Sequence, residues 1–201
     1  MTDTGTDTSP TSDLGPPEPD APRPRRGVVR RNIEWVVIVA VAIVSALVVK
    51  TFLIEAFFIP SPSMDPTLKT GDRVLVNKLS YRVHPIHRGD IVVFERPSGI
   101  SGEPNIRDFI KRVVGLPGET IDSHGDTVFI NDKPLKEPYL PAGTRLGSPI
   151  ERQTIPAKHY FVMGDNRSNS SDSRVFHPIE GAKVVGRAFV LVWKPSRLRL
   201  L

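Results

Sequence analysis

A single long apolar run near the N-terminus constrains this chain more than any other feature. The uncharged stretch 35–49 has 15 residues, about 22 Å of helix, and the wider run 33–54 has 22 residues, about 33 Å of helix. The wider run matches the thickness of the hydrocarbon core of a bilayer. Within it, Glu34 would lie at one interface, and Lys50 would reach the other with its long side chain. The run therefore predicts a single transmembrane helix over residues 32–55.

Charged residues before the run predict on which side of the membrane each end lies. Residues 1–22 carry five acids and no Lys or Arg, whereas residues 23–31 carry five arginines and no acid. Arginines collect on the cytoplasmic side of membrane helices. We therefore expect residues 1–31 to lie in the cytoplasm and residues 56–201 to form an exoplasmic domain of a single-pass protein.

The tail, residues 1–31, has the composition of a disordered segment. Residues 1–24 hold six prolines and only one large apolar residue, Leu14. Such a segment cannot bury enough surface to offset the entropy lost on ordering. We expect an acidic, Pro-rich, disordered tail that ends in the arginine cluster.

Two other interpretations of the apolar run explain less of the sequence. A cleaved secretory signal has a shorter apolar region and is followed by an Ala-x-Ala-like site with a polar flank, which this chain lacks. A buried core helix leaves the five arginines on one side unexplained.

Composition narrows the range of partners. The chain has no cysteine, so disulfides, thiolate metal sites and thiol nucleophiles are excluded. The charges of the tail cancel, so the other 170 residues carry the whole net charge of +5. A basic domain suits nucleic acid or an anionic membrane surface. Because aromatic residues are few and no Lys/Arg-rich helix is visible, we expect membrane phospholipid as a partner and no nucleic acid.

The region after the apolar run is typical of a mainly β domain. Runs rich in Val, Ile and Phe, separated by Gly-Asp, Pro-Gly, Asn-Asp and proline-rich turns, predict strands. These strands are expected at 72–83, 90–97, 107–115, 119–135, 159–165 and 183–195. Asn131 and Asp132 lie between two strand-like segments and predict a hairpin turn. We expect a mostly antiparallel β-sheet domain over residues 56–201.

The stretch "IPSPSMDPTLKTGD" (59–72) presents a serine between prolines. Proline fixes its own φ and biases the residue before it toward extended conformations. Ser61 and Asp65 are therefore expected to be extended, and Ser63 lies between two stiffened dipeptides. The stretch suits either a hydroxyl held in one orientation, as a nucleophile requires, or an ordinary linker.

A lysine interrupts the apolar strand "RDFIKRVVG" (107–115). Strand alternation places Lys111 on one face and Arg112 on the other, and both faces are otherwise apolar, so at least one cation points toward packed surface. Burial would lower the pKa of the lysine from about 10.4 to about 7 or 8, which suits a general base. The alternative is a lysine at a strand edge, with its ammonium group in solvent.

Two further sets of polar residues are compatible with either chemistry or a simple turn. The stretch "GDNRSNSSDSR" (164–174) crowds four serines, two aspartates and two arginines together, which suits a solvated turn or a loop fixed over an active site. The five histidines are His84, His87, His124, His159 and His177. Spacing alone does not exclude a Ser-His-Asp arrangement. His84 and His87 have no acidic or histidine partner nearby in sequence, so we expect no metal site.

Six segments in order along the chain carry a resemblance to a known family. The apolar run, "IPSPSMDPTL", "GDRVLVNK", "RGDIVVF", "FIKRVVGLPGE" and "GDNRSNSSDSR" resemble the bacterial type I signal peptidase (leader peptidase) family, from about residue 33 to residue 195. That family consists of membrane-anchored serine proteases that use a Ser-Lys dyad. The resemblance implies an endopeptidase that cleaves signal peptides from secreted preproteins at the outer face of the bacterial cytoplasmic membrane. It implies an acyl-enzyme mechanism and no metal or other cofactor.

Carried over residue by residue, the resemblance implies a role for each site residue. Ser63 is the nucleophile and Lys111 the general base, Ser61 donates to the oxyanion hole together with the Ser63 N–H, and Ser170 orients the lysine ammonium. The implied ion-pair scaffold consists of Asp165, Asp172, Arg174 and Arg112. The implied lining of the small substrate pockets consists of Ile59, Met64, Leu68 and Ile110.

The sequence departs from the family's pattern in two places. Pro62 stands where many members have Gly between the two serines, which restricts Ser61 and bears on the oxyanion hole. Ser168 and Ser171 stand where other side chains are common, so the choice of Ser170 depends on register. Two other functions stay open: a membrane Ser-Lys peptidase dedicated to one substrate, and an anchored β domain that binds preproteins without cutting them.

Overall fold

The computed structural model describes residues 26–48, 53–100 and 106–201. The chain divides between Ile43 and Val44 into two units, which are described separately. Helix α1 (Arg26–Val48) carries most of the apolar run, in a part of the chain that no proline interrupts. It begins at Arg26 and not at residue 32, so the last residues of the expected tail are helical. The rest of that tail lies outside the described residues.

The C-terminal end of the apolar run also differs from the prediction of a helix to residue 55. Ile54 and Glu55 belong to strand β1 (Ile54–Phe58), because the backbone there pairs with β2 (Arg73–Asn77). Within the part of the chain that the structure describes, no helix is both long and apolar enough to cross a membrane.

The larger sheet of the β domain has eight strands, in the order β1-β2-β11-β3-β4-β9-β10, with β12 also paired to β11. Its other strands are β3 (Ile91–Glu95), β4 (Asp108–Gly115), β9 (His159–Met163), β10 (Ile179–Glu180), β11 (Val184–Trp193) and β12 (Arg199–Leu200). Every pair in it is antiparallel, so the prediction of a mainly β, antiparallel domain is confirmed. Register shifts in β11 mark bulges that bend the sheet.

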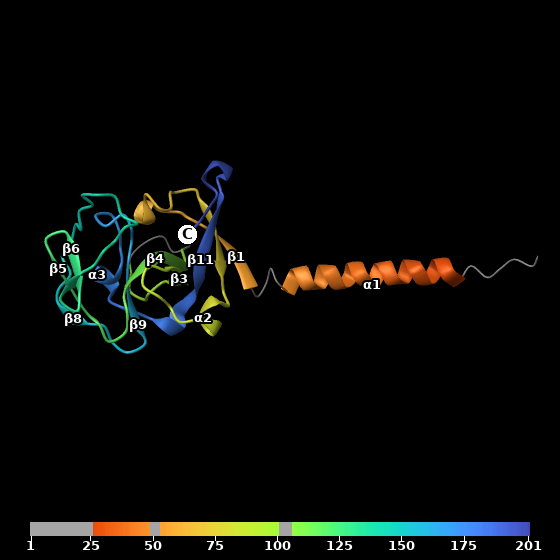
Figure 1. Cartoon of the computed structure of the whole chain (residues 1–201), viewed down its shortest axis with the longest axis horizontal. Helices are drawn as coiled ribbons and strands as arrows, with labels where there is room; N and C mark the ends of the chain where they lie inside the picture. Colours follow the sequence, from red (N-terminus) through yellow and green to blue (C-terminus); the bar gives the residue numbers. More distant parts are fainter. Residues whose placement is uncertain (1–25, 49–52, 101–105) are drawn as a thin grey trace, which may run out of the picture. The chain divides into compact units, whose positions relative to one another are not determined.

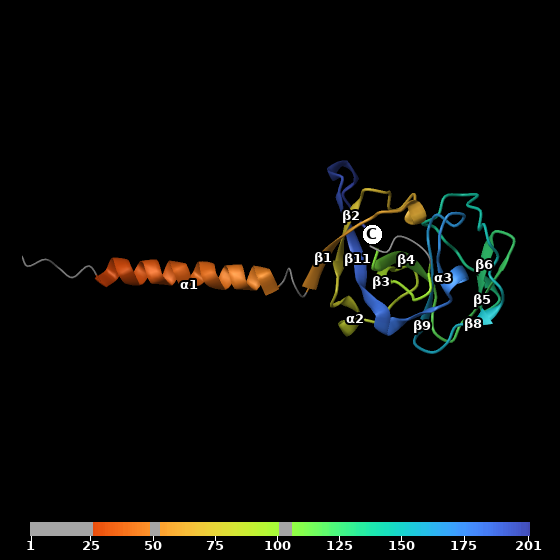
Figure 2. The ribbon, with the colours of Figure 1, turned by 180° about the vertical axis from the view of Figure 1, so that it is seen from behind.

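A smaller sheet lies at the far end of the β domain from β1, as both ribbon views show (Figure 1, Figure 2). Its strands, in the order β7-β6-β5-β8, are β5 (Thr120–His124), β6 (Thr127–Ile130), β7 (Lys133–Pro134) and β8 (Gln153–Thr154). Asn131 and Asp132 both have positive φ and join β6 to β7, which confirms the predicted hairpin. Turns therefore divide the single strand predicted over 119–135 into three.

Three apolar clusters fill the β domain, and strand β4 contributes to all of them. Ile110 packs on the first cluster. Val113 belongs to the second, against which Phe109 packs, and Val114 belongs to the third, between the two sheets. The middle of β4 is therefore surrounded by packed side chains.

Short helical turns connect the strands. They are η2 (Pro62–Met64), α2 (Ser80–Val83), α3 (Ser173–Phe176), η3 (Gly181–Lys183) and η4 (Pro195–Arg197). Helix α2 replaces the end of the strand predicted at 72–83. The side chain of Asn77 accepts a hydrogen bond from the Leu79 N–H at 2.9 Å, which turns the chain out of β2.

Candidate active site

The turn that carries Ser63 is shaped by the prolines around it. Ser61 and Asp65 have extended backbones, as predicted, and Pro62 begins the 3-10 turn η2, in which Ser63 lies. Ser63 itself is therefore in a helical turn. Asn166 holds this turn with two hydrogen bonds of 3.1 Å, from its backbone N–H to the Ser63 carbonyl and from its side chain to the Pro62 carbonyl. Ser63 is buried, with 8% of its surface exposed.

Lys111, on β4, points at the hydroxyl of Ser63. Its Nζ donates a hydrogen bond to Ser63 Oγ at 2.8 Å and another to the Ile110 carbonyl at 3.0 Å. The hydroxyl of Ser61 donates to Ser63 Oγ at 3.3 Å. A hydroxyl within hydrogen-bond reach of an amine base is the geometry of an activated nucleophile.

The surroundings of Lys111 favour its neutral form. Lys111 is 4% exposed, and its Nζ lies 5.6 Å from the centre of the Phe109 ring. Burial lowers the pKa of Lys111 to about 8, and the negative charges of Asp172 and Asp165 offset part of that fall. The alternative of a lysine at a strand edge with its ammonium in solvent is therefore wrong.

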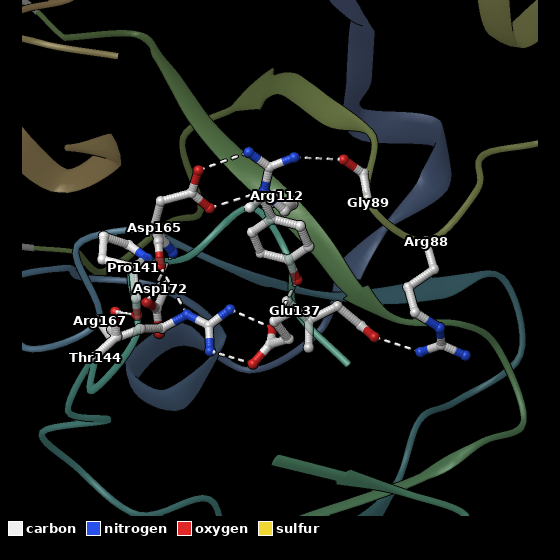
Figure 3. A network of polar contacts seen from close by, with 12 residues as sticks. Arg88, Gly89, Arg112, Glu137, Pro141, Thr144, Asp165, Arg167 and Asp172 are labelled. Atoms are coloured by element: carbon white, nitrogen blue, oxygen red, sulfur yellow. Dashed lines mark hydrogen bonds and ion pairs between the residues drawn. The ribbon is translucent and has the colours of Figure 1, made fainter. Parts of the chain in front are cut away.

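Arg112, the next residue on β4, forms the first of two ion pairs among the predicted scaffold residues. Its Nε and Nη2 donate to the two carboxylate oxygens of Asp165 at 2.8 and 2.6 Å, and its Nη1 donates to the Gly89 carbonyl at 2.8 Å (Figure 3). This two-point geometry fixes the direction of the Asp165 carboxylate. Since both side chains are buried, each charge depends on the other.

Asp172 and Arg174 form the second ion pair. The Asp172 carboxylate accepts from Arg174 Nε and Nη2 at 2.8 Å each, from the Arg174 N–H at 3.3 Å and from the Gly164 N–H at 3.1 Å. Asp172 thereby caps α3 and ties it to the start of the 164–174 loop. The four residues predicted as an ion-pair scaffold thus form two separate pairs.

Ser170 does not form the hydrogen bond to Lys111 that the resemblance implied. Its hydroxyl is buried and has no hydrogen-bond partner among the described residues, because Lys111 donates to Ser63 and Ile110 instead. Ser170 packs against Gly164, where an added Cβ would lie 2.3 Å from both Ser170 Oγ and the Ser63 carbonyl oxygen. Only glycine fits this close approach.

A cavity of about 240 Å³ opens beside Ser63 and Lys111. Its apolar lining comes from Pro60, Ile106, Phe109 and Ile110, and its charged lining includes Arg96 and Asp108. Of the four predicted lining residues, Ile110 lines this cavity. Ile59, Met64 and Leu68 do not line it and are almost fully buried in the first apolar cluster. Hydrogen bonds such as the one from the Leu68 N–H to the Met64 carbonyl fold this segment back, so that these side chains face the core.

Comparison with known proteins decides the family of this chain. Residues 32–193 match the family described as signal peptidase, peptidase S26. The chain belongs to this family. Signal peptidase I of Leptolyngbya laminosa is 39% identical over 194 residues, which cover 94% of this chain and 93% of that protein. Signal peptidase I of Mycobacterium tuberculosis (strain ATCC 25618 / H37Rv) is 33% identical over 229 residues, which cover 89% of this chain and 77% of that protein.

The match also extends to a solved structure. A crystal structure of a signal peptidase I from Enterococcus faecalis V583 is 32% identical, with a TM-score of 0.43, and covers 52% of this chain and 97% of that one. The resemblance found in the sequence motifs is confirmed by the family match and the curated relatives, and the chain is a hydrolase of the signal peptidase family.

The signal peptidase motifs in the sequence did not identify every residue that shapes this site. Asn166 and Arg167 lie inside the polar stretch 164–174, so the high density of polar residues there could have identified them. Glu137, which pairs with Arg167, and Tyr139, whose ring stacks 4.0 Å from Arg112 Cζ, gave no such signal. They lie about 30 residues before Arg167, in the segment interpreted as the second strand of the hairpin at Asn131 and Asp132.

Histidine takes no part in this site within the described part of the chain. None of the five histidines lines the cavity, and the side-chain hydrogen bonds of Ser63 go to Ser61 and Lys111. The Ser-His-Asp alternative therefore finds no support. Among the same described residues, no group of three or more His, Asp or Glu is placed to hold a metal ion.

Proposed function

We propose that this member of the signal peptidase family cleaves N-terminal signal peptides from secreted preproteins, with Ser63 as nucleophile and Lys111 as general base. The observation that carries the proposal is the 2.8 Å hydrogen bond from Lys111 Nζ to Ser63 Oγ in a buried site. A base within hydrogen-bond reach of a hydroxyl, with a pKa close to the working pH, can activate a serine.

The proposed reaction has two steps. Neutral Lys111 takes the proton of Ser63 while Oγ forms a bond to the scissile carbonyl carbon. The lysine ammonium then gives this proton to the leaving amine as the C–N bond breaks. The mature protein leaves with a new N-terminus, and the signal peptide stays as an ester on Ser63. A water that loses its proton to Lys111 hydrolyses this ester and restores the serine hydroxyl.

Ser61 and the Ser63 N–H are the proposed donors to the oxyanion. Pro62 fixes the turn between the two serines, and the Ser61 hydroxyl already lies 3.3 Å from Ser63 Oγ, beside the carbonyl that would be attacked. A preorganised donor of this kind is worth about 3 to 4 kcal/mol of barrier. The free hydroxyl of Ser170 is the proposed acceptor for the Lys111 ammonium once it carries the proton.

The cavity next to Ser63 suits a small residue before the scissile bond. Its apolar walls, from Pro60, Phe109 and Ile110, would favour a short apolar side chain such as Ala. The proposed substrate therefore carries small residues, as in an Ala-x-Ala site, at the end of its signal peptide.

A membrane anchor over residues 32–55 is part of the proposal. The described side chains of α1 from residue 32 to residue 47 are exposed and almost all apolar, and five arginines precede them. An anchor of this kind keeps the N-terminus in the cytoplasm and the peptidase domain, residues 56–201, on the outer face. It would also give the enzyme a high effective concentration at a signal peptide that lies in the same bilayer.

An exposed row of side chains on the larger sheet is the proposed contact with membrane phospholipid. Phe58 and Trp193 both lie opposite Arg73 on the strand between them, and they are 59% and 50% exposed. Two aromatic side chains around a cation suit the boundary between lipid tails and anionic headgroups. Because Phe58 is only five residues before Ser63, this row would bring the cavity close to the bilayer.

The test is cleavage of a preprotein with an Ala-x-Ala site by the full chain in detergent. Ser63→Ala and Lys111→Met should each lose at least about 1,000-fold in kcat, because both groups act as one unit. Ser98→Ala and Lys133→Met change exposed residues outside the cavity and should cut like wild type.

Each other outcome favours a specific alternative. Cleavage by Lys111→Met at the wild-type rate would rule out the lysine base. A wild type that cuts one preprotein and no others in a varied panel would be a peptidase dedicated to that substrate. A wild type that binds preproteins without cutting any, and that Ser63→Ala leaves unchanged, would be a binding domain.

A further inference from the structure

A segment that follows strand β7 of the smaller sheet contacts the loop next to Ser63. Residues 136–148, here called the strap, lie between β7 and β8 in sequence and contact the 164–174 loop. Glu137 pairs with Arg167, and Gly147 packs so closely against the loop that an added Cβ would lie 2.9 Å from a loop Cα atom. The loop that adjoins Ser63 therefore depends on a part of the chain far from it in sequence.

The ion pair between Glu137 and Arg167 is buried and has two points of contact. The side chains are 11% and 2% exposed, and Arg167 Nη1 and Nη2 donate to the two carboxylate oxygens at 2.8 and 2.5 Å (Figure 3). The Tyr139 hydroxyl donates to the same carboxylate at 2.6 Å. Such a fork fixes orientation as well as charge, and removing one partner leaves the other buried and unpaired.

Arg167 connects its ion pair with Glu137 to the backbone beside Ser63. Its Nε donates to the Gly164 carbonyl at 3.1 Å, and its N–H donates to the Asp165 carbonyl at 3.0 Å. Gly164 lies against the Ser63 carbonyl, and Asn166 donates to that carbonyl at 3.1 Å. The Arg167 guanidinium is thus one contact away from the backbone that holds the Ser63 turn.

Tyr139 provides a second route from the strap to the site. Its ring lies 4.0 Å from the Arg112 guanidinium carbon, a stacked cation–π contact. Arg112 in turn holds Asp165 by two hydrogen bonds, and Asp165 is one of the two carboxylates whose charge acts on Lys111. The strap therefore reaches both the Ser63 turn and the carboxylates near Lys111.

We propose that Glu137 is a positioning residue for the peptidase reaction, which acts through Arg167 to hold the 164–167 backbone against Ser63. The inference rests on the proposed function, in which Ser63 and Lys111 react. Glu137 does not line the cavity, so its loss should change the geometry of the reacting groups and leave substrate contacts intact. A misplacement of about 1 Å at reacting groups costs about 100-fold in rate.

Two substitutions test the fork from its two sides. Glu137→Gln removes the charge with little change of shape, whereas Arg167→Lys keeps the charge and loses both the fork and the Nε bond to Gly164. We expect kcat to fall about 10- to 100-fold in each, with KM within about twofold of wild type. The double variant should be no worse than the single ones, because both act on one contact. A kcat within about twofold of wild type in both single variants, or fully additive losses, overturns the proposal.

Glu119→Gln is the matched control for loss of stability. Glu119 forms an ion pair of 2.5 Å with Arg88, and its hydrogen bonds go to Arg88 and the Leu116 N–H, away from the 164–174 loop. We expect it to lower the melting temperature about as much as Glu137→Gln does, and to leave kcat unchanged. An equal fall in kcat for Glu119→Gln would make the effect a general loss of stability and overturn the positioning role.

The dependence of kcat/KM on pH gives a readout that lower stability alone does not move. Arg167→Lys leaves the net charge unchanged, so the substitution itself adds no charge that would change the pKa of Lys111. A shift in the acid limb, the side of the pH profile where activity falls toward low pH, then reports movement of Asp165 and Asp172 relative to Lys111. These carboxylates raise the pKa of Lys111, so moving them away lowers it, and the acid limb should shift to lower pH. An acid limb identical to that of wild type, together with a wild-type kcat, overturns the proposal.

Two further variants keep the test decisive. If Glu137→Gln does not fold, Tyr139→Phe is the substitute variant, because it removes only the hydroxyl that donates to Glu137. It should lower kcat about two- to fivefold, and an unchanged kcat counts against the proposal. Ser63→Ala in the same assay tests the proposed function separately from the positioning role of Glu137. Activity in Ser63→Ala means that the proposed function fails, whereas an inactive Ser63→Ala beside a fully active Glu137→Gln means that only the positioning role fails.

Discussion

At the scale of single residues, the charge of Lys111 controls how activity depends on pH. Burial lowers its pKa to about 8. In the proposed mechanism, the neutral amine is the form that accepts the Ser63 proton. We expect kcat/KM to rise about tenfold per pH unit up to about pH 8 and to level off above it. Initial rates of preprotein cleavage measure this profile. A profile that stays flat down to about pH 5 would contradict a lysine base.

The same burial makes Lys111 unfavourable for folding at low pH. Its pKa falls from 10.5 to about 8, so below that pH the native state holds a buried ammonium that the unfolded chain holds in water. A difference of this size is about 3 kcal/mol. Lys111→Met should therefore be more stable than wild type by up to about 3 kcal/mol below about pH 8.

This advantage of Lys111→Met should shrink between pH 8 and 10.5, the two pKa values. In that window the unfolded wild type binds a proton that the native state has lost, so wild-type stability rises with pH. Urea unfolding of both proteins at several pH values measures the difference. An advantage that stays constant through this window would mean that Lys111 is not the buried titrating group.

Ser170→Ala separates a role in catalysis from a role in stability. The hydroxyl of Ser170 has no hydrogen-bond partner in the resting site, so its loss should change the free energy of unfolding by less than about 0.5 kcal/mol. If the hydroxyl receives the Lys111 ammonium during the reaction, kcat should fall about 10- to 100-fold. Parallel urea unfolding and cleavage assays check both values. A wild-type kcat would remove Ser170 from the mechanism.

At the scale of elements, Asp172 joins the start of α3 to the 164–174 loop and also neutralises Arg174. Asp172→Asn keeps the shape but leaves the buried guanidinium without its charge partner. We expect a loss of about 3 to 5 kcal/mol in the free energy of unfolding. Glu55→Gln, which breaks the exposed pair with Lys78, should cost less than about 1 kcal/mol. Similar losses in the two variants, measured by urea unfolding, would mean that burial does not strengthen the Asp172 pair.

The loop also shows how far sequence reasoning could reach into the site. The resemblance to the family implied that Ser61, Ser63 and Lys111 meet, because each motif is local and the order of the motifs along the chain is distinctive. The hydrogen bond implied for Ser170 is absent from the resting site, since the choice of hydrogen-bond partner depends on distances that spacing does not give. Glu137 could not be found, because its partner Arg167 lies 30 residues away and only the folded strap brings them together.

At the scale of the whole molecule, the sequence predicted the composition of the sheets but not their order. Alternation and turn residues identified the long strands β3, β4, β9 and β11. No local pattern shows that β11, the last of them, inserts between β2 and β3. Strands of two residues, such as β8 and β12, are too short for any periodicity. The first two residues of strand β1 were assigned to the predicted transmembrane helix, because the apolar run continues into Ile54 with no turn residue before it.

The lipid contact proposed for the whole molecule leads to a prediction about two assays of the same enzyme. Phe58→Ser combined with Trp193→Ser removes the exposed aromatic groups beside Arg73, outside the cavity. Losing two aromatic contacts with lipid should lower preprotein cleavage in vesicles with anionic phospholipid about tenfold or more. Cleavage of a short soluble peptide in detergent should stay within about twofold of wild type, because the reacting groups are unchanged.

Val175→Ser is the matched control for these two assays. It replaces an apolar side chain that is also exposed but lies on α3, away from the row of Phe58, Arg73 and Trp193. It should cut like wild type in vesicles and in detergent. A double variant that loses as much activity in detergent as in vesicles would have damaged the site itself. Equal losses of activity for Val175→Ser in vesicles would mean that any exposed apolar side chain contributes to lipid binding. The row of Phe58, Arg73 and Trp193 would then not be the specific contact with the bilayer.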